Sequence, residues 1–240
     1  MLKKTQTANP ARGQFYQQYQ SKRSSKKTLY FIGPYTGRKF YFLPFFWVVQ
    51  WLGYRIVYLQ PVNAVLDSSQ PQWLEQAIVQ AQDVIYADRK EVQRDEDYLL
   101  GVSLGSYIGL NVILTERFKK FVVIAGGAPL ADIFRTHYLF YSQRRKLRKN
   151  GGFEHIDAHW KKFDEAFKKH QLNGLRVLGF NSRADHMITQ QRLQAFMDEL
   201  IKAGAKIESR LTHFYPHEVQ AFSTNWRMFA VDKFFKKTDM

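Results

Sequence analysis

Short apolar runs alternate along the chain with longer segments in which apolar residues recur at helical spacing. A short apolar run bounded by Gly, Pro or polar residues predicts a buried strand. Such runs lie at 28–32, 54–59, 98–102, 118–125, 175–180 and 207–211. Helix-length segments lie at 39–52, 68–91, 104–114, 131–170, 190–203 and 217–236, with a break at 150–152. Strands that alternate with helices predict parallel pairing through right-handed crossovers, with helices on both faces.

The predicted fold is one α/β domain over residues 28–240, with a mostly parallel sheet of about six strands. A chain of 240 residues with 45% apolar content is long enough for one core and short for two ordinary domains. Residues 1–27 are polar and basic, and they predict an N-terminal extension, partly disordered, with a short helix near 15–20.

The sequence predicts neither a membrane span nor a secreted, disulfide-linked protein. Its longest apolar segment, 40–53, is shorter than the roughly 20 residues a span needs and is interrupted by Pro44 and Gln50, which predicts a buried helix. No apolar segment follows the basic N-terminal residues, so no secretory signal is expected. Without cysteine there is no disulfide, Cys-based zinc site or thiol nucleophile. A cytoplasmic location is the default expectation.

Charge is the unusual part of the composition. The chain has 36 Lys+Arg against 21 Asp+Glu, a formal charge of +15, and basic clusters at 22–27 and 144–149. Such an excess favours anionic partners such as nucleic acid, phospholipid surfaces or acidic substrates. No nucleic-acid-binding motif accompanies it, so solubility is the simpler interpretation and specific nucleic-acid binding is not expected.

The strongest chemical signal is Gly101-Val-Ser-Leu-Gly105. It follows the predicted strand 98–102 and opens the predicted helix 104–114, which is the strand–turn–helix setting of a nucleophile elbow. The glycines permit the sharp turn beside the neighbouring strand and helix, and the turn aims N–H groups at a reacting oxygen. The alternative is a tight turn with an idle serine, and the order of the elements favours Ser103 as a nucleophile.

With these residues, the chain from Thr28 onward resembles the α/β-hydrolase fold family, starting at what would be its third strand; no clear counterpart of the first strands is visible in 1–27. The family's order of nucleophile, acid and histidine implies an acid after 175–180, where 181–188 resembles the acid loop and Asp185 matches. The histidine is expected after the last strand, where His213 and His217 both lie. The family's spacing favours His217.

The resemblance implies acyl transfer without a cofactor: His217 deprotonates Ser103, and Asp185 orients the imidazole. The oxyanion would be bound by the N–H of Leu104 and by a second N–H from the loop 33–37. This loop departs from the family's His-Gly pattern, because Pro34 has no N–H. A register shifted by one residue assigns the second donor to Tyr35, which we expect.

The expected function is hydrolysis of a carboxylic ester, or a thioester, of a small-molecule acyl substrate. The family inserts a lid at the position of 128–173, which predicts a small helical cap here, and the basic residues 144–149 are candidates for contact with an anionic substrate or phospholipid surface. Two alternatives stay open: a catalytically silent binding or scaffold protein of this fold, and a basic nucleic-acid-associated protein.

Other candidate groups favour structural interpretations. His155 and His159 share a helix face, but no third strong ligand lies nearby, so no metal site is expected. The aromatic residues in 40–51 predict core packing, with part of them as candidates for an acyl pocket.

Overall fold

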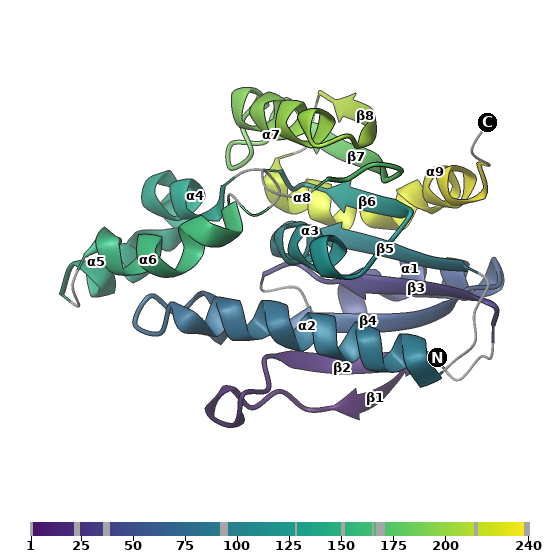
Figure 1. The fold of residues 1–240 in the computed structure, drawn as a ribbon, viewed down its shortest axis with the longest axis horizontal. Coiled ribbons are helices and arrows are strands. Elements are labelled where there is room, and N and C mark those ends of the chain that lie inside the picture. Colours follow the sequence, from purple (N-terminus) through teal and green to yellow (C-terminus); the bar gives the residue numbers. More distant parts are fainter. Residues whose placement is uncertain are drawn as a thin grey trace.

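An eight-stranded sheet forms the centre of the protein in the computed structural model, which describes residues 2–21, 25–35, 39–91, 96–127, 129–149, 152–164, 166, 171–213 and 216–237 (Figure 1). The strand order is β1-β2-β4-β3-β5-β6-β7-β8. The strands are β1 Leu2–Gln6, β2 Tyr16–Ser21, β3 Lys27–Ile32, β4 Arg55–Pro61, β5 Glu96–Val102, β6 Lys120–Ile124, β7 Arg176–Ser182 and β8 Lys206–Thr212.

The strands from β3 to β8 pair in parallel, which confirms the predicted α/β class. Their central members are buried on both faces; in β3, for example, the last five residues are all buried. Continuous apolar runs are what such strands require, because helices cover both faces of a parallel sheet. All six predicted strands are present, within a few residues of the predicted ends.

The prediction of an N-terminal extension with a short helix is wrong. Residues 2–6 and 16–21 form β1 and β2, which pair antiparallel with each other, while β2 pairs antiparallel with β4. Tyr16 packs on one side of the sheet and Tyr19 on the other, between half-buried glutamines. β2 lies between β1 and β4 and yet buries few apolar side chains, so its sequence has a polar pattern although its backbone is paired on both sides.

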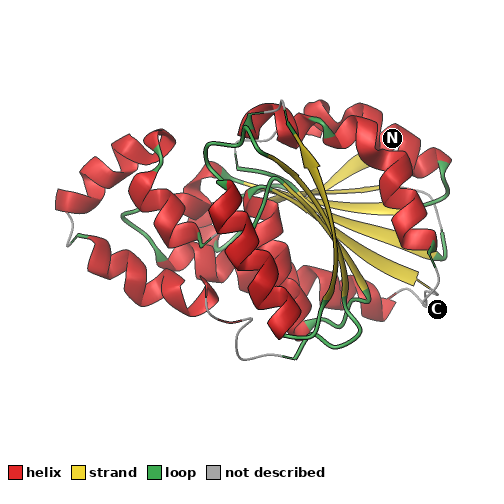
Figure 2. Cartoon of the chain, turned by 90° about the horizontal axis from the view of Figure 1, so that it is seen from above, coloured by secondary structure: helices red, strands yellow, loops and turns green. Residues whose placement is uncertain are grey.

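Helices cover the two faces of the sheet as separate layers (Figures 1 and 2). One core cluster contains side chains of α2 (Gln72–Glu91), α3 (Leu104–Thr115) and α7 (Gln190–Lys202), together with those of the helices between β6 and β7. The other contains side chains of α1 (Leu43–Trp51) and α9 (Thr224–Lys236), which lie on the opposite face. The short elements are η1 Pro10–Arg12, η2 Lys39–Phe42, η3 Asn63–Leu66 and α8 His217–Phe222.

The prediction that 40–53 is a buried helix is only half right. Phe42, Phe45 and Phe46 pack against the sheet, whereas Trp47 and Trp51 are 78% and 73% exposed. The reason is the layer architecture: α1 covers the sheet with one side, and among the described residues no further layer covers its other side.

The segment between β6 and β7 is helical. It contains α4 Leu130–Thr136, η4 Tyr138–Phe140, α5 Tyr141–Lys149 and α6 Phe153–Asp164, which project beyond the sheet at the left of Figures 1 and 2. Buried Trp160 of α6 donates a hydrogen bond to the carbonyl of Pro71 at 2.8 Å, which holds the group against the start of α2. Within the predicted cap, 128–173, residues 128, 150, 151, 165 and 167–170 lie outside the described residues.

Buried tyrosines make the fold sensitive to alkali. Burial raises the pKa of Tyr16 and of Tyr58 above its ordinary value, and both side chains are at most 1% exposed. Because the folded state favours the neutral phenol, the two tyrosines contribute fully to the free energy of unfolding below the unfolded pKa of about 10. This contribution is lost as the pH rises above that value. We expect the free energy of unfolding, from urea titrations between pH 9 and 12, to fall by roughly 3 kcal/mol per pH unit above pH 10 for these two groups. The Tyr58→Phe variant should show a shallower fall; an unchanged slope would contradict this assignment.

Candidate active site

Ser103 stands at the turn between β5 and α3 in a backbone conformation that L-residues rarely adopt, with φ +52° and ψ −117°. Its N–H donates to the carbonyl of Ile124 at 2.8 Å, so the backbone of Ser103 continues the pairing between β5 and β6. Its own carbonyl accepts from Ser106 N–H at 2.9 Å and thereby starts the helix. Strain held in this way by the surrounding structure is typical of functional turns.

The two glycines of the motif are required by close approach. A Cβ on Gly101 would lie 2.5 Å from the carbonyl oxygen of Gly105 and from the Cα of Ser106. A Cβ on Gly105 would lie 2.0 Å from the carbonyl oxygen of Ile32, at the end of β3. The first turn of α3 is therefore packed against the strand that leads into the loop 33–37, and only glycine fits there.

The three residues predicted as a triad lie together. His217 Nε2 is 2.8 Å from Ser103 Oγ, and His217 Nδ1 is 2.8 Å from Asp185 Oδ2. The three residues come from different parts of the fold: the turn after β5, the loop after β7, and the first residue of α8. All three positions are at the carboxyl ends of the strands, where ligand sites of open α/β sheets lie.

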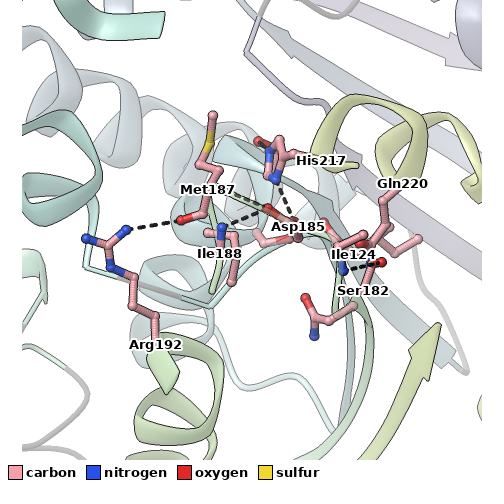
Figure 3. A network of polar contacts seen from close by, with 12 residues as sticks. Ile124, Ser182, Asp185, Met187, Ile188, Arg192, His217 and Gln220 are labelled. Carbon is pink, nitrogen blue, oxygen red and sulfur yellow. Dashed lines mark hydrogen bonds and ion pairs between the residues drawn. The ribbon is translucent and has the colours of Figure 1, made fainter. Parts of the chain in front are cut away.

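The two carboxylate oxygens of Asp185 have separate partners (Figure 3). Oδ1 accepts hydrogen bonds from the N–H groups of Met187 at 2.9 Å and Ile188 at 2.8 Å, which leaves Oδ2 for the imidazole. Asp185 is 3% exposed and His217 5%, so little water competes for these bonds. Arg192 of α7 donates to the carbonyl of Met187 at 3.2 Å and to Thr136 of α4 at 3.0 Å, which ties the acid loop to both helices.

His213, the alternative histidine, is exposed in the residues after β8. It lies four positions before His217, and the structure brings His217 to Ser103. Residues 214 and 215, between the two, lie outside the described residues.

The described part of the predicted oxyanion loop consists of Gly33, Pro34 and Tyr35. Gly33 N–H donates to the carbonyl of Leu59 at 2.9 Å, so it belongs to the sheet. Pro34 has no N–H. Tyr35 therefore carries the first backbone N–H after Gly33, and residues 36 and 37 lie outside the described residues.

Side chains of the helical segment reach both loops beside the triad. Phe140 of η4 lies 6.0 Å from the ring of Tyr35, measured between centroids. His137, just before η4, stacks on His186 of the acid loop at 5.0 Å and 23°. Neither histidine stands in a sequence pattern that predicts a role. No local motif could have paired them, since 49 positions separate them and only the packing of the segment brings them together.

A cavity of about 810 Å³ lies between α3, α4, α6 and α7, and the triad residues do not line it. Its walls contain residues of both charges: Arg135, Lys161, Arg192, Lys202, Asp132, Asp157, Asp198 and Glu199. Several of these are paired with each other, such as Arg135 with Asp157 and Lys202 with Glu199. The walls thus show no preference for one sign of ligand charge.

The described residues contain no group of three or more His, Cys, Asp or Glu side chains suited to a metal ion. His155 and His159 contact one another at a ring distance of 5.6 Å, and Asp157 between them pairs with Arg135.

Comparison with solved structures shows the α/β-hydrolase fold. An acylaminoacyl peptidase of Pyrococcus horikoshii matches 92% of the chain at a TM-score of 0.66 and 13% identity. Mouse α/β hydrolase domain-containing protein 10 matches 98% of the chain at a TM-score of 0.63 and 11% identity. An esterase of Pyrococcus furiosus matches 98% of the chain at a TM-score of 0.65 and 11% identity. No family model and no curated protein matches the sequence.

The extent of the match differs between these structures. The chain spans 39% of the length of the acylaminoacyl peptidase, but 98% of the mouse protein and 91% of the esterase. At these identities the likeness shows the fold alone.

Proposed function

We propose that this protein is a serine hydrolase that cleaves a carboxylic ester or thioester through an acyl-enzyme intermediate. The observation that supports this most directly is the continuous hydrogen-bonded line from Ser103 Oγ through the His217 imidazole to Asp185. An idle serine in a tight turn would need neither a buried histidine at 2.8 Å nor a carboxylate held by two N–H groups. The esterase among the similar folds agrees with this chemistry.

In the proposed reaction, Ser103 Oγ attacks the acyl carbon while His217 Nε2 accepts the hydroxyl proton. The imidazole then donates that proton to the leaving oxygen or sulfur, and the acyl group stays on Ser103. Water, deprotonated by the same Nε2, attacks the acyl carbon, and the imidazolium returns the proton to Ser103 Oγ as the acyl–Oγ bond breaks and the acid leaves. Asp185 keeps the Nδ1 proton in place and stabilises the imidazolium that forms in each half-reaction.

An active-site-directed fluorophosphonate tests the proposal. We expect the wild-type chain to be labelled once, at Ser103, as located by peptide mass analysis, and Ser103→Ala to remain unlabelled. Ser69→Ala, which changes an exposed serine before α2, serves as the matched control and should be labelled like the wild type. Failure of the wild type to react, or equal reaction of Ser103→Ala, would favour the catalytically silent alternative.

We further propose that the oxyanion is bound by the N–H groups of Leu104 and Tyr35. Tyr35→Pro removes one N–H, and loss of one such donor lowers kcat by roughly 100- to 1000-fold. Tyr35→Ala keeps the N–H and removes the ring that contacts Phe140, so it is the matched control. Hydrolysis of a nitrophenyl ester by the two variants distinguishes the backbone from the side chain; equal losses in both would contradict the assignment.

A further inference from the structure

Six large apolar side chains are exposed along η2, α1 and α9. We call them the aromatic band, and they are Phe40, Leu43, Trp47, Trp51, Trp226 and Phe229. Trp47 and Trp226 are 78% and 74% exposed, more than any other large apolar side chain among the described residues. The band belongs to the face of the sheet opposite to α2, α3 and α7.

The two halves of the band are joined. The side chain of Asn225 accepts a hydrogen bond from Phe45 N–H at 3.2 Å and donates one to the carbonyl of Tyr41 at 3.0 Å, which fixes the start of α9 against the start of α1. Residues 43, 47 and 51 recur every four positions, and 226 and 229 are three apart, so each set lies on the side of its helix turned away from the sheet.

The composition of α1 is unusual for a surface helix. All of its residues except Gln50 are nonpolar. A helix that is apolar on all sides is normally buried in a core or in lipid, and a contiguous exposed apolar patch marks an interaction site. No helix among the described residues is long and apolar enough to cross a membrane.

The charged residues beside the aromatic band indicate the chemistry of its partner. Lys233 and Lys236 continue the outer side of α9, seven and ten positions after Trp226, and Lys237 follows. No Asp or Glu occurs in the first 66 residues, which include η2 and α1. The one acidic residue of α9, Asp232, accepts from buried Tyr54 at 2.8 Å and pairs with Lys236 at 2.8 Å. Lys237 lies 4.0 Å from Glu208 of β8, which also pairs with Arg210 at 2.9 Å, so the aromatic band is bordered by an excess of positive charge.

We propose that the aromatic band and its lysines dock on the surface of an anionic lipid bilayer. Tryptophan and phenylalanine bury their rings at the level of the headgroups, and lysines beside them are attracted to acidic lipid. A second copy of the chain is a poor alternative occupant, because it would bring together the same lysines and two net charges of +15.

The band begins near the active-site edge of the sheet. It starts at η2, shortly after the loop that follows β3, and α9 begins seven residues after His217. Docking would therefore bring Ser103's edge of the sheet towards the lipid. The aromatic band and its charges would favour lipid docking whether or not Ser103 is catalytic.

Vesicle flotation of the full chain tests the proposal. We expect binding to vesicles of phosphatidylcholine with phosphatidylserine, weaker binding to phosphatidylcholine alone, and weakening at high salt. Trp47→Ser combined with Trp51→Ser should lower the affinity about tenfold or more, as should Trp226→Ser with Phe229→Ser. Lys233→Ala with Lys237→Ala should lower it roughly 30-fold.

Matched controls remove similar groups elsewhere. Tyr86→Ser with Ile201→Ser removes two exposed apolar side chains from α2 and α7, and Lys146→Ala with Arg148→Ala removes two exposed charges from the basic cluster of α5. Both should bind like the wild type. Circular dichroism identifies any variant that fails to fold, and the α1 and α9 variants test the band independently.

Three results would overturn the proposal: no binding to either vesicle, binding that the α5 variant loses while the band variants keep it, or binding independent of phosphatidylserine. A wild-type mass of two chains in light scattering that falls to one in the Trp47→Ser, Trp51→Ser variant would instead assign the band to an interface between copies.

Discussion

Replacement of Ser103 by alanine is expected to lower kcat for a nitrophenyl ester by roughly 10⁵-fold or more, without loss of the fold. The hydroxyl makes its described contact with His217, so its removal leaves the strained turn and the helix start in place. Since serine and histidine act as one unit, His217→Ala should cost a similar factor, and the double variant no more than either single one.

Substitution of Asp185 is expected to lower kcat in the same assay, but by less than substitution of Ser103 or His217. Asp185→Asn keeps one oxygen for the N–H groups of Met187 and Ile188 but presents an amide to the imidazole, so we expect a fall of about 10⁴ in kcat. His213→Ala is the matched control and should keep wild-type activity. If His213→Ala abolished hydrolysis while His217→Ala did not, the assignment of the base would be wrong.

The positions of the triad could be predicted because each depends on local pattern and chain order. Gly101 and Gly105 around Ser103 predict a sharp strand-to-helix turn. Parallel strands place the loops that follow their carboxyl ends at one edge of the sheet. Asp185 and His217 then need only to follow the right strands. Their mutual distances could not be predicted, because they depend on how α8 packs against the sheet.

The sequence does not predict the structure or exposure of elements that depend on partners distant in the chain. β2 carries three glutamines and is a strand because β1 and β4 pair with it. Trp47 and Trp51 are exposed because no outer layer covers α1 in the described structure. No residue of α1 itself predicts that this layer is absent. The contact of His137 with His186 likewise comes from tertiary packing alone.

Gly105→Ala is expected to be the most destabilising small substitution at the site. The new Cβ would lie 2.0 Å from the carbonyl oxygen of Ile32 and 2.6 Å from that of Gly33, and both are backbone atoms. β3 cannot move aside, because it pairs with β4 on one side and β5 on the other. The start of α3 must shift instead, and we expect the free energy of unfolding to fall by about 5 kcal/mol or more, measured by urea titration.

Gly13→Ala separates this collision from the general effect of adding a methyl group. Gly13 has φ +70°, and a Cβ there would have nothing within 4 Å, so alanine should cost only the backbone strain of about 1–2 kcal/mol. If Gly105→Ala were no more destabilising than Gly13→Ala, the close packing of α3 on β3 would be refuted. Where Gly105→Ala still folds, the displaced Ser103 and Leu104 should lower esterase activity further than the lost stability explains, because the nucleophile and an oxyanion donor move together.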